Sequence, residues 1–349
     1  MTFSGSYPAD DVTFLLKPVT LTPTSVAEKE RLVGQGRHYS EMIAPETPPG
    51  PAYLRLYHEA LARNGARLAA DVASLAATLA ERAGREVVIA SLARAGTPIG
   101  VLLRRVLAAR GVPVTHYSLS IIRDRGIDPI ALAHIAARHD PADVVFVDGW
   151  TGKGAIADEL ARARPFGLAP RLAVIADPAG CADFAATADD YLIASGLLNG
   201  VVSGLVSRSI LSAATVGPGD FHACVTYPQC APADLSRAFI DTVAPLAIAA
   251  PATPAPDHDR PALRAAGEAT VAAVMAATGV SDRNRIKPGI AEATRALLRR
   301  VPDRLFLRDA TDPDVAHLLH LAHEAGVAIE PLPRDSRYRA VAVIAKVGE

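Results

Sequence analysis

The stretch VVFVDGWTGKGAIADEL, residues 144–160, contains the structural unit that is repeated along much of this chain. An apolar run ends in Asp148, a glycine-rich loop follows, and a helical pattern begins near Ala155. Strands that are apolar on both faces are typical of parallel sheets covered by helices on both sides. A similar strand-first pattern recurs over residues 85–111, 112–140 and 171–195. The sequence therefore predicts an α/β fold with a doubly wound parallel sheet, whose ligands bind beyond the C-terminal strand ends.

The proline-rich segment 251–262, PATPAPDHDRPA, predicts a linker between two domains. We expect residues 1–250 to form the sheet domain, with an N-terminal extension as a hood over the site. We expect residues 263–349 to form a small α/β domain. Its predicted helices are 263–278, 288–299 and 315–326, and its predicted strands are 304–309, 327–332 and 340–347.

Composition excludes several classes of protein. The chain has 349 residues, half of them apolar, and a formal net charge of −1, so it lacks a strong overall field for nucleic acid. Its three cysteines show no CxxC spacing, which argues against a disulfide framework or a zinc ribbon. The sequence shows no signal peptide and no run of about 20 apolar residues. We therefore expect a cytoplasmic protein that does not enter a membrane.

Three interpretations of the loop after Asp148 compete. A Walker A loop fails on spacing, because Lys153 is followed by Gly154 instead of Ser or Thr. A turn without any ligand is the second. The third is a loop for phosphoribosyl diphosphate (PRPP) or another ribose 5-phosphate ligand, in which Asp148 bonds the ribose hydroxyls. The 5′-phosphate would then be held by backbone N–H groups of Thr151, Gly152, Lys153 and Gly154.

This loop resembles the fingerprint of type I phosphoribosyltransferases, although Gly149 replaces the second acid. One unit earlier, VVIASLARAGTPIG resembles the diphosphate loop of those enzymes. The resemblance implies that the diphosphate and its Mg²⁺ are held by Ala93, Arg94, Ala95 and Gly96. It also places Arg123 and Arg125, in SIIRDRGID, in a charged lid that closes over the diphosphate.

The resemblance implies a Mg²⁺-dependent glycosyltransferase that acts at the ribose anomeric carbon on an unknown acceptor. Its catalytic residues would be Asp148, Arg94, Arg123 and Arg125. Mg²⁺ would be bound through PRPP, with Asp148 as a candidate ligand. The candidates for contact with the acceptor are His38, Ser195, Asn199 and Arg208, the last three on an expected helical face.

More of the chain resembles the StiP-type proteins of tellurite-resistance and stress gene clusters. The resemblance rests on FSGSY, FLLKPV, EKERLVGQGRHYSEMI, DYLIASGLLNGVVSGLVSRSI and GDFHA. It implies a phosphoribosyltransferase fused to a Pelota-type RNA-binding domain, and some members carry the label cysteine protease. NRIKPGIAEATRALL resembles the helix start of kink-turn-binding proteins, with Ala291 in place of the asparagine that would read RNA. The implied RNA contacts are Lys287, Gly289, Glu292 and Arg295.

Two other functions stay open at this point. One is a nucleotide-sensing RNA-binding protein whose site binds its ligand without turnover. The other is a cysteine protease in which Cys181, expected at the head of a helix, is activated by His222. A homodimer, and a C-terminal domain that contacts protein instead of RNA, also stay open.

Overall fold

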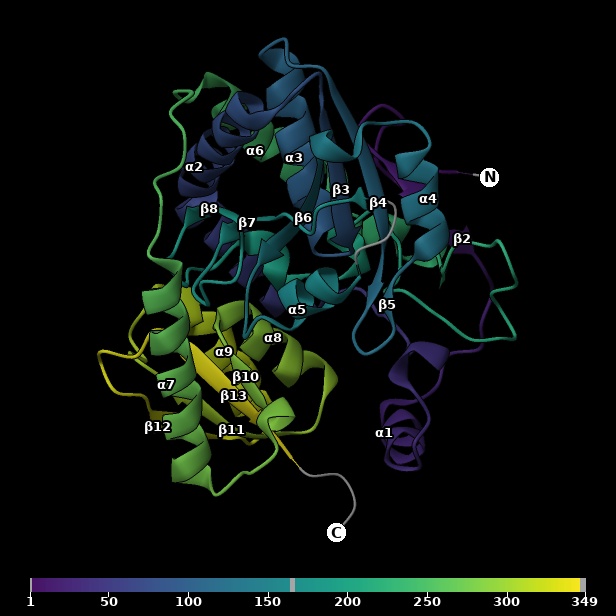
Figure 1. Cartoon of the computed structure of the whole chain (residues 1–349). Coiled ribbons are helices and arrows are strands. Elements are labelled where there is room, and N and C mark those ends of the chain that lie inside the picture. The colour runs from purple at the N-terminus through teal and green to yellow at the C-terminus, as the bar shows by residue number, and fades with distance from the viewer. Residues whose placement is uncertain (1, 164–166, 346–349) are drawn as a thin grey trace.

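The structure is a computed structural model that describes residues 2–163 and 167–345 (Figure 1). Its larger sheet has the strand order β1-β4-β3-β6-β7-β8, and neighbouring strands along this path are parallel. A short strand, β5, pairs antiparallel with β4. The strands are β1 (Thr13–Leu15), β3 (Val87–Ala93), β4 (Val114–Ile122), β5 (Gly126–Ile127), β6 (Val144–Trp150), β7 (Leu172–Ala176) and β8 (Phe184–Thr187). The predicted α/β fold with a parallel sheet is confirmed.

Helices cover both faces of this sheet, because alternate strand residues point to opposite sides. Val145 and Val147 of β6 pack in the core that contains α2, α3 and α6, whereas Val144 and Phe146 pack in the core that contains α4 and α5. The bounds of these helices are α2 (Pro51–Arg82), α3 (Gly96–Ala109), α4 (Pro129–Ala136), α5 (Ala155–Arg162) and α6 (Ser236–Ala249).

Two predicted helices of this domain are absent from the described residues. Cys181 lies in a loop between β7 and β8 and does not head a helix, because the Asp177 carboxylate accepts the N–H groups of Cys181 and Ala182 at 2.9 Å. The expected helical face from Ser195 to Arg208 is replaced by the short 3₁₀ helices η4 (Ala194–Leu197) and η5 (Gly200–Val202). Gly204 has a φ of 78°, in the left-handed region, so a right-handed helix cannot continue through it.

The N-terminal segment contains strands and helices of its own. Strand β1 extends the sheet beside β4, and β2 (Lys17–Pro18) pairs with β9 (Ala223–Cys224). Helix α1 (Val26–Gly34) and the 3₁₀ helix η1 (Tyr39–Glu41) follow β2. The described residues of this domain also include the 3₁₀ helices η2 (Pro141–Asp143) and η6 (Pro228–Ala233).

The C-terminal domain is built on a four-stranded sheet of order β10-β13-β11-β12. Its strands are β10 (Ile286–Pro288), β11 (Pro302–Leu307), β12 (Ala328–Pro331) and β13 (Ala340–Ile344). Its helices are α7 (Arg260–Thr278), α8 (Ile290–Arg299) and α9 (Ala316–Glu324), with the 3₁₀ helices η7 (Arg283–Arg285) and η8 (Pro313–Val315). Helix α7 begins inside the predicted linker, because the Asp259 side chain caps it by accepting the Ala262 N–H. Strand β10 was not predicted.

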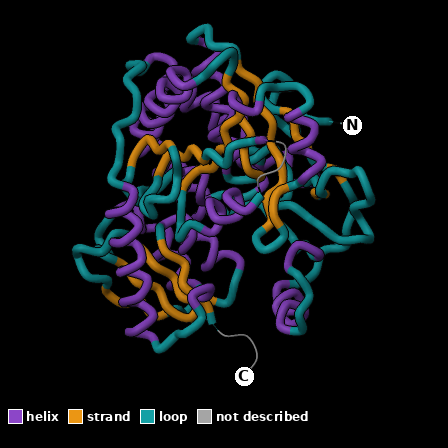
Figure 2. The backbone as a smooth tube through the Cα atoms, in the orientation of Figure 1, coloured by secondary structure: helices purple, strands orange, loops and turns teal. Residues whose placement is uncertain are grey.

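The two sheets form separate groups of strands, joined by a contact of the C-terminal domain with the loop after β6 (Figure 2). The Lys153 Nζ donates to the Ile286 carbonyl at 3.0 Å, and the Ile290 N–H donates to Asp190 at 3.1 Å. The C-terminal domain therefore covers the edge of the sheet at which ligands of such folds bind. None of the helices in the described part of the chain combines the length and apolar character that a membrane crossing demands.

Candidate functional site

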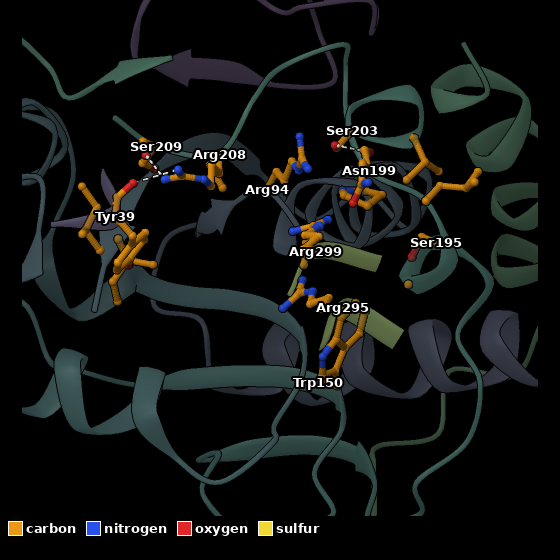
Figure 3. A pocket seen from close by; sticks show the side chains of 18 residues that line it. Tyr39, Arg94, Trp150, Ser195, Asn199, Ser203, Arg208, Ser209, Arg295 and Arg299 are labelled. Atoms are coloured by element: carbon orange, nitrogen blue, oxygen red, sulfur yellow. Dashed lines mark hydrogen bonds between the residues drawn. The ribbon is translucent and has the colours of Figure 1, made fainter. Parts of the chain in front are cut away.

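The loops that follow β3 and β6 meet where the strand order reverses, since the chain runs from β3 to β4 on one side and returns to β6 on the other. Ligands of open parallel sheets bind at such a point. A cavity of about 190 Å³ lies here (Figure 3). Its polar and charged lining includes Tyr39, Arg94, Ser195, Asn199, Ser203, Arg208, Ser209, Arg295 and Arg299.

Two larger cavities adjoin it, of about 420 Å³ and about 440 Å³. All three share Arg208 and Arg299, so we name them together the arginine crevice. Most of the site residues predicted from sequence line it. They are Ala93, Arg94, Ala95, Arg123, Asp148, Thr151, Gly152, Lys153, Gly154, Ser195, Asn199, Arg208, Lys287, Glu292 and Arg295.

Arg94 is already neutralised by the chain itself. Its Nη2 forms an ion pair with Glu46, and its Nη1 donates to the Val206 carbonyl at 3.1 Å. The other Glu46 oxygen accepts the Gly200 N–H at 3.0 Å. Burial raises the pKa of Glu46, but the charge and hydrogen bond of Arg94, the charge of Arg299 and the Gly200 N–H together hold this pKa below its ordinary value. The Arg94 guanidinium, which was predicted to bind a diphosphate, is therefore already paired with the Glu46 carboxylate.

The other arginines of the crevice differ in how they are held. Arg208 lies over the Tyr39 ring, 5.3 Å from its centroid, and donates to the Tyr39 carbonyl at 2.8 Å. Arg295 lies over the Trp150 ring at 4.8 Å and donates to Glu292 at 2.9 Å. For Arg299, no hydrogen bond or ion pair is present among the described residues. Burial, and then the charges of Arg94 and Arg295, lower its pKa to about 9.

The predicted phosphate loop is engaged by the C-terminal domain. Lys153 donates to the Arg283 and Ile286 carbonyls, and a Cβ added to Gly152 would lie 2.8 Å from Glu292 Cγ. Thr151 donates its hydroxyl hydrogen to Asp177. Burial, and then the charges of Lys287 and Arg123, lower the pKa of Lys153 to about 7. At the end of β6, burial raises the pKa of Asp148 to about 6.

The predicted lid is the hairpin between β4 and β5, and both of its arginines contact the N-terminal segment. Arg125 donates to Glu41 at 2.6 Å, and the Arg123 N–H donates to the Tyr39 hydroxyl at 3.0 Å. His38, a predicted acceptor contact, instead caps η1, where its Nδ1 accepts the Ser40 N–H at 3.3 Å. Gly96, from the predicted diphosphate loop, begins α3.

The predicted RNA-binding helix start faces inward. The Asp190 carboxylate lies at the N-terminus of α8, where it accepts the Ile290 N–H at 3.1 Å and the Arg339 N–H at 2.8 Å. A Cβ added to Gly289 would lie 3.5 Å from Asp190 Oδ1. A carboxylate of the sheet domain therefore occupies the start of α8, which the resemblance assigned to RNA contact.

The three thiols lie in different surroundings. Cys181 lines a cavity of about 110 Å³ together with Lys153, Gly154 and Arg264. Its Sγ donates to the Ala179 carbonyl at 3.3 Å and accepts from Arg264 Nη2 at 3.7 Å. Burial raises the pKa of Cys181, and the Arg264 contact opposes this effect.

His222 is not placed to activate Cys181. Its Nδ1 bonds the Ser120 hydroxyl of β4 at 2.8 Å, whereas Cys181 follows β7. These strands are separated by β3 and β6, which corresponds to roughly 14 Å at the usual strand spacing. Among the described residues, no histidine lines the Cys181 cavity.

Cys224 and Cys230 are both buried. Cys224 lies in the apolar core, and burial raises its pKa to about 12. Cys230 lines the 440 Å³ cavity, to which His320 and Glu324 of α9 also contribute. His320 Nε2 lies 3.4 Å from Glu324 Oε1. No local pattern predicts this grouping, because Cys230 and His320 come from different domains.

Comparison with known proteins adds to this geometry. Residues 5–244 match the family described as "Tellurite-like stress resistance cysteine protease StiP", and residues 265–346 match the "PELOTA RNA binding domain" family. The chain is 42% identical to "Cysteine protease StiP" of Acinetobacter baylyi (strain ATCC 33305 / BD413 / ADP1) over 365 residues. That alignment covers 99% of this chain and 95% of the relative.

These matches correct the function predicted from sequence. The StiP and Pelota resemblances are confirmed, but PRPP transfer by a glycosyltransferase is wrong, because the matching family and relative are named as cysteine proteases. The contacts of Arg94 and Lys153 give a physical reason why these side chains do not bind PRPP phosphates. Arg94 pairs with Glu46, and Lys153 donates to carbonyls of the C-terminal domain. Among the described residues, no group of three or more His, Cys, Asp or Glu could hold a metal ion. Because Mg²⁺ was expected to bind through PRPP, that expectation stays an untested prediction.

Proposed function

Since the chain belongs to the StiP family, we propose that it is a thiol-dependent peptidase whose nucleophile is Cys181. The observation that carries the choice of Cys181 is the Arg264 guanidinium 3.7 Å from its Sγ. A cation at this distance stabilises a thiolate, which is the nucleophilic form of cysteine. Cys224 lacks such a site because it lies in the apolar core.

Lys153 is the base in this proposal. It lines the same cavity as Cys181, and its pKa of about 7 leaves a large neutral fraction near neutral pH. Serine–lysine pairs show that an amine can replace histidine in such a reaction. Neutral Lys153 takes the thiol proton as Sγ attacks the peptide carbonyl carbon. It returns that proton to the leaving amine as the C–N bond breaks, and water then hydrolyses the thioester.

A protease assay on the full chain tests this proposal. Casein and a mixed peptide library would be incubated with the parent and with Cys181→Ser, Cys224→Ser and Cys230→Ser. We expect cleavage by the parent, Cys224→Ser and Cys230→Ser, and loss of cleavage in Cys181→Ser. Loss only in Cys230→Ser would move the nucleophile to the cavity that contains His320. Absence of cleavage by the folded parent would overturn the peptidase proposal.

RNA binding by the C-terminal domain is a second proposal, supported by the family match over residues 265–346. Because Asp190 covers the start of α8, the RNA contact would lie on another face of this domain. In the full chain, Lys287→Ala and Arg295→Ala should therefore leave the affinity for structured RNA unchanged. A large loss of RNA affinity in these variants would show that α8 opens to RNA after all.

A further inference from the structure

Arg299 is a buried guanidinium on which the carboxylates of Glu46 and Glu292 act through their charges, without a hydrogen bond or ion pair among the described residues. Its guanidinium lines all three cavities of the arginine crevice, and within residues 2–163 and 167–345 it has neither a hydrogen bond nor an ion pair. Its neighbours Arg94 and Arg295 carry the same charge. Burying a guanidinium charge next to other positive charges destabilises the folded state unless an anion pairs with it.

The balance of charges around Arg299 is strongly positive. The described residues that line the 420 Å³ cavity include eight basic side chains and two carboxylates. The basic residues are Lys29, Arg123, Lys153, Arg208, Lys287, Arg295, Arg299 and Arg300, and the carboxylates are Asp148 and Glu292. Low-dielectric walls lined by one sign of charge concentrate the field and attract ligands of opposite charge.

Buried polar atoms without partners provide a second, independent observation. Ser195 and Ser209 line the 190 Å³ cavity and are both 5% exposed. Neither hydroxyl has a hydrogen-bond partner in the part of the chain that the structure describes. The Asn199 Oδ1 in the same cavity lacks a donor. Buried polar atoms are normally paired, so these three point to a ligand that is not part of the chain.

The chemistry of the partners favours a carboxylate on a peptide. The paired arginines of the crevice already hold carboxylates, Arg94 that of Glu46 and Arg295 that of Glu292. Asn199 Oδ1 requires a donor, which a peptide N–H supplies and an ionised phosphodiester does not. The volume of about 420 Å³ lies in the roughly 300–1,000 Å³ range of ligand pockets.

The crevice also adjoins the cavity of the proposed nucleophile. Lys153 and Gly154 line both the 420 Å³ cavity and the smaller cavity of Cys181. Gly154 has no side chain, and a Cβ there would lie 2.9 Å from Cys181 Sγ. A peptide bound in the crevice at Gly154 would therefore lie next to the thiol.

We propose that the arginine crevice binds acidic peptide segments, with a substrate carboxylate paired to Arg299 and the substrate main chain bonded at Ser195 and Asn199. This inference rests on the peptidase proposal for its substrate role. It predicts that the enzyme selects sites with Glu or Asp close to the cleaved bond. Selection arises because an uncharged side chain would leave the Arg299 charge unpaired.

Binding can be measured without turnover in full-length Cys181→Ser. The probes are two fluorescent octapeptides that differ only in Glu against Gln at their central positions. We expect the Glu peptide to bind at least about tenfold tighter, and Arg299→Gln, added to Cys181→Ser, to abolish the difference. The control, Arg138→Gln, removes an exposed arginine that donates to the His134 carbonyl and should change nothing. Arg295→Gln serves as a second crevice variant, and thermal unfolding reports whether each variant is folded.

The outcomes separate this inference from the proposed function. Equal binding and equal cleavage of the Glu and Gln peptides would overturn the inference and leave the peptidase proposal standing. Glu-selective binding that depends on Arg299, without cleavage by the parent, would support the inference as a binding site and overturn the peptidase. A short RNA oligonucleotide that displaces the Glu peptide at lower concentration than unlabelled Glu peptide, and requires Arg299, would overturn the inference in favour of RNA.

Discussion

The Tyr338 hydroxyl donates a hydrogen bond to the Gly152 carbonyl at 2.7 Å, and thereby joins the C-terminal domain to the loop that follows β6. This bond connects residues 186 positions apart in the sequence. It lies beside the Lys153 contacts with the same domain, so the loop and the domain are expected to unfold together.

Tyr338→Phe should therefore lower the free energy of unfolding by about 1–3 kcal/mol, because it leaves the Gly152 carbonyl without its donor. Urea denaturation measures this change. Tyr57→Phe is the matched control, since the Tyr57 hydroxyl is also buried but has no partner. That variant should be neutral or more stable. Equal losses in the two variants would show that the Gly152 bond contributes nothing specific.

Gly154 should be sensitive to substitution for two reasons. Its φ of 87° lies in the left-handed region, and an added Cβ would lie 2.9 Å from Cys181 Sγ. Gly111→Ala isolates the first effect, because Gly111 has φ 75° and no atom near the position of an added Cβ. We expect about 1–2 kcal/mol for Gly111→Ala, and an additional loss of about 1–3 kcal/mol for Gly154→Ala. Equal losses in urea denaturation would mean that the thiol moves aside without cost.

Asp148 should make stability depend on pH. Burial raises its pKa to about 6 in the folded chain, above the roughly 3.9 of an unfolded aspartate. The folded state therefore binds more protons between pH 4 and 6, and its contribution to stability falls as pH rises through that window. Asp148→Asn should remove about 1–3 kcal/mol of this decline, measured by denaturation at several pH values. The exposed Asp257→Asn should keep the slope of the parent, and an unchanged slope in Asp148→Asn would contradict the assignment.

We expect the Arg299 charge to destabilise the folded chain. Arg299 has no hydrogen bond or ion pair within the described residues, and burial and the charges of Arg94 and Arg295 outweigh those of Glu46 and Glu292, so Arg299→Gln should raise the free energy of unfolding by about 1–3 kcal/mol. Arg295→Gln should instead lower it, since Arg295 is bonded to Glu292 and lies over Trp150. Thermal and urea unfolding of both variants test the contrast. Destabilisation by both substitutions would mean that Arg299 has a partner inside the fold.

The sequence predicted the sheet because its strands, such as 144–150, carry apolar residues on both faces, a pattern that only a doubly covered sheet satisfies. It also identified Asp148 and Arg94 as residues of the same crevice, because the ends of parallel strands meet at one edge. The predicted PRPP chemistry was wrong, because a Gly- and Thr-rich loop has the same composition whether it binds phosphate or packs against another domain. The hydrogen bond between Asp190 and Ile290 joins residues 100 positions apart, and no local sequence pattern predicts such a contact.

Thiol reactivity should report the Arg264 contact directly. Of the three cysteines, Cys181 should be alkylated first by iodoacetamide in the native chain, because Arg264 favours its thiolate and it lines a polar cavity. Arg264→Met should slow this reaction about 3–10-fold, since a higher pKa leaves less thiolate. Arg260→Met is the matched control, because Arg260 lies on the same helix but pairs with Asp183 at 3.2 Å. Mass spectrometry of digests after timed alkylation assigns each rate to its cysteine. Faster labelling of Cys230, or equal rates in Arg264→Met and the parent, would remove the main argument for Cys181 as the nucleophile.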